Sequence, residues 1–134
     1  MEMNLETKID LIKIANQARK WAYVPYSNYP VGAAVLTESG RIYDGVNIEN
    51  AAYPVTICAE RVAIFKAVSN GEKNLKAIAV VTRNGGMPCG SCRQVMAEFG
   101  PEMQVIVADE SEKIIAEKKL SDLLPGAFNS DSLV

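Results

Sequence analysis

The residues of this chain best suited to metal chemistry are its three cysteines. Cys89 and Cys92 belong to the string Pro88-Cys89-Gly90-Ser91-Cys92, which opens one expected helix, and Cys58 immediately precedes another. Helix N-termini lower the pKa of a thiol and so favour the thiolate that binds metals. Zinc takes thiolates in a tetrahedral site, and three protein ligands leave one position for water, as in catalytic sites. The cysteines therefore favour a catalytic zinc site.

Other interpretations of the cysteines stay open at this level. A C-x-x-C pair also occurs in thioredoxin-like redox proteins and as half of a structural zinc site. A redox pair leaves Cys58 unexplained, and a structural site calls for a fourth Cys or a His, neither of which the chain has. Free cysteines are often small buried hydrophobic residues, although here Gly, Ser, Glu and Arg flank them. The absence of His also excludes Ser-His-Asp and Cys-His catalysis.

Glu60 is the candidate for acid–base work. It lies two residues after Cys58, in the first turn of a helix expected over residues 59–69 that is apolar on most faces. Such a helix is buried, either inside the domain or between subunits. An acidic residue near a helix start interacts favourably with the helix dipole, but a buried carboxylate must pair or do work. Beside a metal-activated water it can take a proton and deliver it to a leaving group.

The elements that must position these residues follow from hydrophobic periodicity. We expect helices over residues 5–22, 59–69, 89–99 and 121–124, and strands over 31–37, 41–46, 77–82, 104–109 and 113–117. The Gly-containing connection between the first two strands predicts a β-hairpin. The strand–helix–strand order over 77–109 predicts a βαβ unit with parallel strands. Together they predict an α/β fold with a mixed sheet.

Composition limits the remaining possibilities. The chain has 134 residues, 49% hydrophobic and 22% charged, which predicts a single globular domain over residues 1–134. Its net charge of −2 argues against a nucleic-acid partner. No apolar run approaches the roughly 18 residues of a membrane span, and the N-terminus has no signal-peptide pattern. We therefore expect a cytoplasmic protein that does not bind membranes.

The order Cys58-Ala59-Glu60 and then Pro88 to Cys92 matches the pattern of zinc nucleobase deaminases in its three-cysteine form. Residues 26–34, 46–53, 58–61 and 123–128 resemble the small, homotetrameric cytidine deaminases. The resemblance implies a three-layer α/β/α sandwich with a mixed, mostly five-stranded sheet. It also implies hydrolytic deamination of cytidine and deoxycytidine to uridine and deoxyuridine, in pyrimidine salvage.

The resemblance assigns roles at the metal. It implies that Cys58, Cys89 and Cys92 hold one zinc ion per subunit and that Glu60 shuttles the proton. Three thiolates make zinc a weaker Lewis acid, so donors to the sulfurs are needed to offset the charge. Arg61 matches the family residue with that role.

Arg93 is either a second donor of this kind or a solvated arginine on the helix surface.

The resemblance also assigns substrate contacts. Asn47 and Glu49 match a ribose-binding pair, and residues two apart in an extended segment point the same way; a merely polar loop is the alternative. Tyr29 stands where the family has a Phe that packs on the pyrimidine, and the backbone at Ala59 contacts the base. Phe128 resembles an aromatic residue supplied by a neighbouring subunit, which implies a homotetramer with active sites at its interfaces. Tyr29 and Phe128 could equally be core residues.

Related functions compete with this one. Blasticidin S deaminases share the zinc pattern but differ around residues 47–50. Deaminases of single-stranded nucleic acid need a positive surface, and nucleotide deaminases need a phosphate-binding cluster, which no group of Lys or Arg residues here suggests. A structural zinc module without catalysis is the alternative from another class, and Glu60 argues against it.

Overall fold

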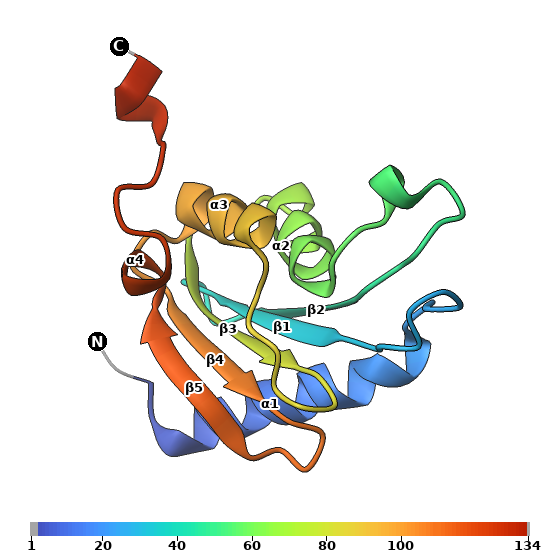
Figure 1. Cartoon of the computed structure of the whole chain (residues 1–134). Helices are drawn as coiled ribbons and strands as arrows, with labels where there is room; N and C mark the ends of the chain where they lie inside the picture. The colour runs from blue at the N-terminus through green and yellow to red at the C-terminus, as the bar shows by residue number, and fades with distance from the viewer. Residues whose placement is uncertain (1–2, 134) are drawn as a thin grey trace.

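The computed structural model describes residues 3–133 and arranges them as a sheet with helices on both faces (Figure 1). The helices and strands are α1 Leu5–Ala18, β1 Gly32–Thr37, β2 Ile42–Val46, α2 Ala59–Ser69, β3 Leu75–Val81, α3 Gly90–Phe99, β4 Gln104–Ala108, β5 Ile114–Lys119 and α4 Leu120–Leu123. Short 3₁₀ turns cover Arg19–Trp21, Tyr53–Val55 and Ser130–Leu133. Among residues 3–133, no helix combines the length and apolarity that crossing a membrane requires.

The strands form a five-stranded mixed sheet in the order β2-β1-β3-β4-β5. β1 pairs antiparallel with β2 as the predicted hairpin, and also with β3. β3 and β4 are parallel, which confirms the predicted βαβ unit through α3. β5 closes the sheet antiparallel to β4.

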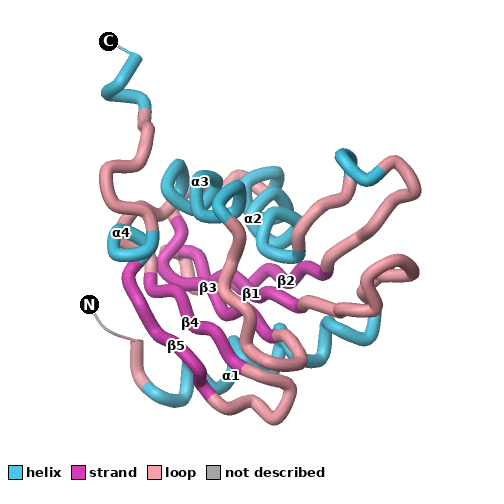
Figure 2. The backbone as a smooth tube through the Cα atoms, viewed as in Figure 1, coloured by secondary structure: helices cyan, strands magenta, loops and turns pink. Residues whose placement is uncertain are grey.

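Three layers follow from the alternation of side chains along the strands (Figures 1 and 2). On β3, Ile78 and Val80 pack in the core shared with α2 and α3, whereas Ala77 and Ala79 face α1. β3 is buried on both faces along nearly its whole length, as its continuous apolar run predicts. The predicted α/β/α sandwich is therefore confirmed.

The first helix ends earlier than its apolar pattern predicts. The α-helix stops at Ala18 and tightens into a 3₁₀ turn instead of continuing to residue 22. The chain leaves the helix because Tyr23 pairs with a distant segment: its N–H donates to the Asn47 carbonyl and its carbonyl accepts from the Glu49 N–H. These bonds tie the N-terminal layer to the segment after β2.

One end of the sheet gathers the segments that matter for chemistry. Gly32 at the start of β1 is paired with Val46 at the end of β2 and with Val81 at the end of β3. The segments that precede β1, follow β2 and follow β3 therefore come together at the same end of these strands. Cys58 and Cys89, which directly precede α2 and α3, lie at this end too, because they line one pocket with Val31, Asn47 and Thr82 from these three segments.

Close packing of α2 on β2 depends on Gly45. A Cβ at residue 45 would lie 2.5 Å from the Ala63 nitrogen and 2.6 Å from the Ala59 carbonyl oxygen. Any side chain there must push away the helix that carries Glu60.

We expect Gly45→Ala to lower the free energy of unfolding by about 1–3 kcal/mol, the usual cost of overpacking. Urea denaturation followed by circular dichroism measures this loss. Gly90→Ala is the matched control, since a Cβ at residue 90 meets nothing within 4 Å. Equal midpoints for Gly45→Ala and the wild type would show that α2 does not rest on this contact.

Candidate active site

The three cysteines come together at the beginnings of α2 and α3. Cys58 and Cys89 occupy the N-cap positions of these helices, and Cys92 lies in the first turn of α3. Neither N-cap sulfur accepts a capping hydrogen bond from a backbone N–H of its own helix. The Cys58 and Cys89 sulfurs are 3.9 Å apart, and all three Sγ atoms lie within 4.8 Å of one another.

The spacing and chemistry of these donors fit a zinc ion. A tetrahedral zinc about 2.3 Å from each thiolate separates the sulfurs by about 3.8 Å. The Cys58–Cys89 separation of 3.9 Å matches this edge. Thiolates are the soft donors that select zinc over hard cations such as magnesium. The cluster can therefore supply three of four tetrahedral positions.

The thiols of Cys58 and Cys92 differ in how readily they ionise. Hydrogen bonding with Cys92 lowers the pKa of Cys58, and the neighbouring Arg61 guanidinium lowers it further. The pKa of Cys92 is raised because of the bond with Cys58 and because its sulfur is buried. Of these two thiols Cys58 therefore ionises more readily, and the partial positive charge at the start of α2 acts in the same direction.

Arg61 and Arg93 make quite different contacts. Arg61 Nη2 donates to the Cys58 sulfur at 3.3 Å, and this bond raises the pKa of the guanidinium. Arg93 contacts no sulfur: its Nε donates to the Pro88 carbonyl at 2.9 Å and its Nη1 to the Leu123 carbonyl at 3.1 Å. Arg93 is therefore neither a sulfur donor nor a solvated surface arginine. It ties the turn before Cys89 to α4.

Glu60 combines burial with access to a cavity. Its side chain is only 4% exposed, yet it lines a pocket together with Cys58 and Cys89. Burial raises the pKa of Glu60 to about 7, and the nearby Cys58 charge adds to the effect. A carboxyl with a pKa near neutrality can both accept and return a proton, which is the property of a general acid–base group.

The pocket next to the cluster has a volume of about 200 Å³. It combines an apolar wall with a polar end formed by the two cysteines and Glu60. Its lining residues are Tyr29, Val31, Asn47, Cys58, Ala59, Glu60, Val80, Thr82, Gly86, Met87 and Cys89. A small flat ring with a polar edge suits such a space.

Asn47 and Glu49 both bond to the segment before β1, but at different residues. The Asn47 amide is held by two bonds, accepting from the Val31 N–H and donating to the Tyr29 carbonyl, both at 2.9 Å. Glu49 lies outside the pocket lining, where its Oε1 accepts from the N–H groups of Tyr26 and Ser27 at 3.0 and 3.2 Å. The pKa of Glu49 is lowered chiefly by hydrogen bonding with the Ser27 side chain, and these two backbone bonds lower it further.

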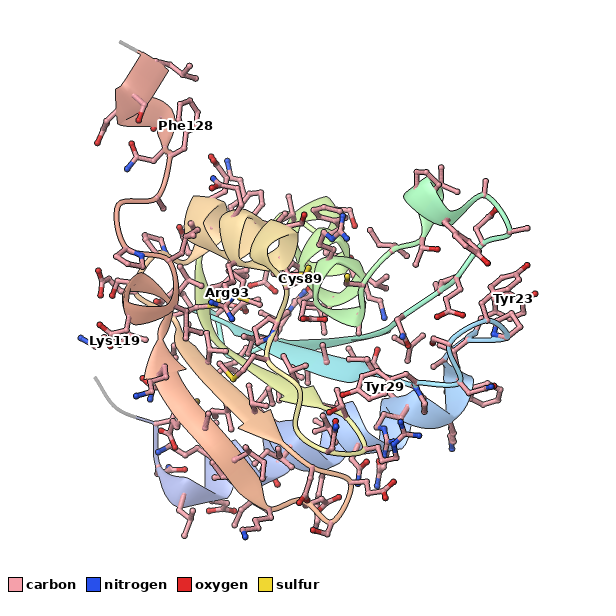
Figure 3. The ribbon with its side chains drawn as sticks, in the orientation of Figure 1. Tyr23, Tyr29, Cys89, Arg93, Lys119 and Phe128 are labelled. Atoms are coloured by element: carbon pink, nitrogen blue, oxygen red, sulfur yellow. The ribbon has the colours of Figure 1, made fainter. Side chains whose placement is uncertain are left out.

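Phe128 does not join the other predicted residues. It is 58% exposed, on the C-terminal segment that projects from the body beyond α4 (Figure 3). The Gln94 side chain donates to its carbonyl at 2.9 Å, so α3 holds this segment. The alternative that Phe128 is a core residue is therefore wrong for the isolated chain.

Sequence reasoning missed the loop between β3 and α3. Thr82, Gly86 and Met87 from this loop line the pocket. The available signal was the Gly85-Gly86 pair directly before Pro88-Cys89, since paired glycines mark a turn that lets backbone approach closely. The loop's contact with Tyr29 joins residues far apart in the sequence, and no local pattern predicts it.

Comparison of the whole chain with known proteins shows its family. A family model described as the cytidine and deoxycytidylate deaminase zinc-binding region matches residues 5–108. The chain belongs to this family. The matched span contains all three cysteines and Glu60. Both the family match and the geometry of the three sulfurs therefore support a zinc site at the cluster.

Proteins named cytidine deaminases resemble this chain over most of its length. The protein from Sporosarcina psychrophila is 51% identical over 125 residues, covering 92% of each chain. That from Halalkalibacterium halodurans is 50% identical, covering 92% of this chain and 95% of the relative. A crystal structure of the cytidine deaminase from Burkholderia pseudomallei superposes with a TM-score of 0.85 at 42% identity, covering 94% of this chain and all of that one. The predicted family and fold are confirmed.

Proposed function

We propose that this protein hydrolyses cytidine and deoxycytidine to uridine and deoxyuridine with release of ammonia, as an enzyme of pyrimidine salvage. The observation that carries the proposal is the cluster of three sulfurs at zinc spacing beside a buried carboxyl with a raised pKa. Relatives named cytidine deaminases, about half identical over nearly the whole chain, support the substrate.

In this proposal Cys58, Cys89 and Cys92 hold one zinc ion per subunit. The bound zinc supplies a Lewis acid that lowers the pKa of a water molecule and so provides the nucleophile. Glu60 removes a proton from the attacking water and delivers it to N3 of the pyrimidine ring. Glu60 then takes the second proton of the attacking water, from the oxygen now bonded to C4, and delivers it to the amino group, which leaves as ammonia as the C4–N bond breaks. The oxygen stays on C4, so cytidine plus water balances uridine plus ammonia.

The remaining pocket residues orient the nucleoside. Tyr29 packs against the pyrimidine, the backbone at Ala59 contacts the base, and Asn47 and Glu49 bind the ribose. In the chain described, Glu49 already accepts two backbone bonds from the segment before Tyr29, and its second carboxylate oxygen is the one that would meet a ribose hydroxyl.

The proposal includes a cytoplasmic homotetramer of single-domain chains in which Phe128 enters a neighbour's site. Exposed apolar side chains support subunit contacts: Phe65 on α2 is 45% exposed, and Tyr53 and Val55 are 69% and 66% exposed. The projecting position of Phe128 suits a role outside its own chain. A reducing cytoplasm suits three thiols that must stay unoxidised.

A substrate panel tests the function. Purified protein is assayed with cytidine, deoxycytidine, their monophosphates, free cytosine and blasticidin S, and its zinc content and molecular mass are measured on the same sample. We expect about one zinc per chain, the mass of four chains, and turnover of the two nucleosides. Zinc-loaded protein that turns over only blasticidin S would reassign the substrate, and zinc without any turnover would point to a structural module.

Arg61 is proposed to offset the charge of the three thiolates. We expect Arg61→Ala to weaken zinc binding by about 10- to 100-fold, the usual effect of removing a partner of a metal ligand, because it deletes the donor to Cys58. Competition with a chromophoric chelator measures the affinity. Arg41→Ala, at the hairpin turn on the opposite end of β1, is the control. Unchanged zinc affinity in Arg61→Ala would remove this role.

A further inference from the structure

The Tyr29 hydroxyl is bound to the loop that follows β3. It donates to the Asn84 Oδ1 at 2.6 Å, and the Arg83 guanidinium lies 5.3 Å from the centre of the Tyr29 ring. The side chain is thus fixed at its tip and over one face. Figure 3 shows Tyr29 beside the start of β1, next to this loop. A phenylalanine could not make the bond at the tip.

Thr82 makes the loop a fixed partner for Tyr29. It is 2% exposed, and its hydroxyl accepts from the Gly85 and Gly86 N–H groups, both at 2.8 Å. The same hydroxyl has its proton directed at Asn84 Oδ1, 3.5 Å away. The one donor site and the two acceptor sites of the Thr82 hydroxyl are then all used. The turn that carries Asn84 is therefore anchored to the buried end of β3.

Gly86 provides the close approach between the two segments. A Cβ at residue 86 would lie 2.7 Å from the Tyr29 hydroxyl oxygen. Only glycine lets the loop come this close to the tyrosine without displacing it. Both Gly86 and Tyr29 line the pocket, so the loop and the ring together define one wall.

We infer that Asn84 is a positioning residue that holds the Tyr29 ring as a wall of the nucleobase pocket through its side-chain carbonyl. The inference rests on the proposed function for the identity of the base. Neither residue hydrogen-bonds a cysteine or Glu60 in the described chain. The bond therefore acts on substrate binding: its loss raises KM and leaves kcat nearly unchanged.

Four variants test this role with cytidine as substrate. Asn84→Ala and Tyr29→Phe each raise KM by about 2- to 10-fold, as expected for one lost neutral hydrogen bond. The double variant is no worse than the poorer single variant, because both remove the same bond. Asn84→Asp keeps an acceptor at the same position and retains a KM near that of the wild type. Tyr29→Phe separates the hydrogen bond from space filling, because it deletes only the hydroxyl that Asn84 accepts from.

Tyr43→Phe is the matched control, since it deletes a tyrosine hydroxyl that donates to Glu72 at 2.9 Å away from the pocket; we expect its KM to be unchanged. Tyr29→Phe loses a single oxygen atom and tests the role even if Asn84→Ala fails to fold. Single variants within twofold of the wild-type KM, or a double variant whose effects multiply, overturn the positioning role while an active wild type keeps the proposed function. A wild type inactive on cytidine overturns both.

Discussion

Replacing Glu60 by glutamine is expected to reduce kcat for cytidine by at least about 10²- to 10⁴-fold, the contribution typical of a general acid–base group, while the protein keeps about one zinc per chain. Glutamine has nearly the same shape and fills the same buried position, but its amide cannot carry a proton between water, ring and leaving group. Initial rates at saturating cytidine, with zinc measured on the same preparation, give both quantities.

Glu98→Gln is the matched control because it makes the same change on the exposed face of α3. It should leave kcat and zinc content as they are. A near-normal kcat in Glu60→Gln would exclude Glu60 as the proton carrier. Loss of zinc together with activity would mean that the carboxylate supports the metal site rather than the proton transfer.

Cys89→Ser is expected to weaken zinc binding by more than about 100-fold, since even partners of metal ligands cost 10- to 100-fold when removed, and to abolish turnover of cytidine. A serine hydroxyl does not ionise as a thiol does, so two thiolates remain where three are needed. Cys89 is exposed whereas Cys92 is buried, so the Cys89 substitution leaves the core intact. Zinc content after dialysis and the cytidine assay measure the two effects.

Ser91→Ala is the control for Cys89→Ser, because Ser91 is exposed between the two cysteines of the same turn. Circular dichroism of both variants should match the wild type. If Cys89→Ser retained stoichiometric zinc at wild-type affinity, the ligand set would have to be revised.

The parts of the fold predicted well are those governed by local periodicity. α2 begins and ends at the predicted residues 59 and 69, because the apolar run between Cys58 and Asn70 is too long for a typical strand and suits a buried helix. β3 and the β1–β2 hairpin follow in the same way. The end of α1 could not be predicted, because it depends on pairing between Tyr23 and the segment after β2, which is set by tertiary structure.

The candidate site shows the same division. The cysteines and Glu60 were predictable because residue type, spacing and helix starts converge on one chemistry. The contacts of Arg93 were not, because its partners are backbone carbonyls of a turn and of α4. Asn84 could not be predicted either, because its proposed role depends on a hydrogen bond from Tyr29, which is fifty-five residues away in the chain.

The position of the pocket at one end of the sheet has a consequence for how the sequence can vary. The hairpin turn of Glu38, Ser39 and Gly40 lies at the opposite end, is exposed, and contributes nothing to the pocket lining. Exposed turns of this kind accept insertions with little penalty. Length changes over evolution, or an inserted peptide tag, are therefore better tolerated there than in the loops around the pocket. At the other end, hydrogen bonds join the loops around residues 29, 47 and 84. A change in the length of one of these loops would therefore disturb the others.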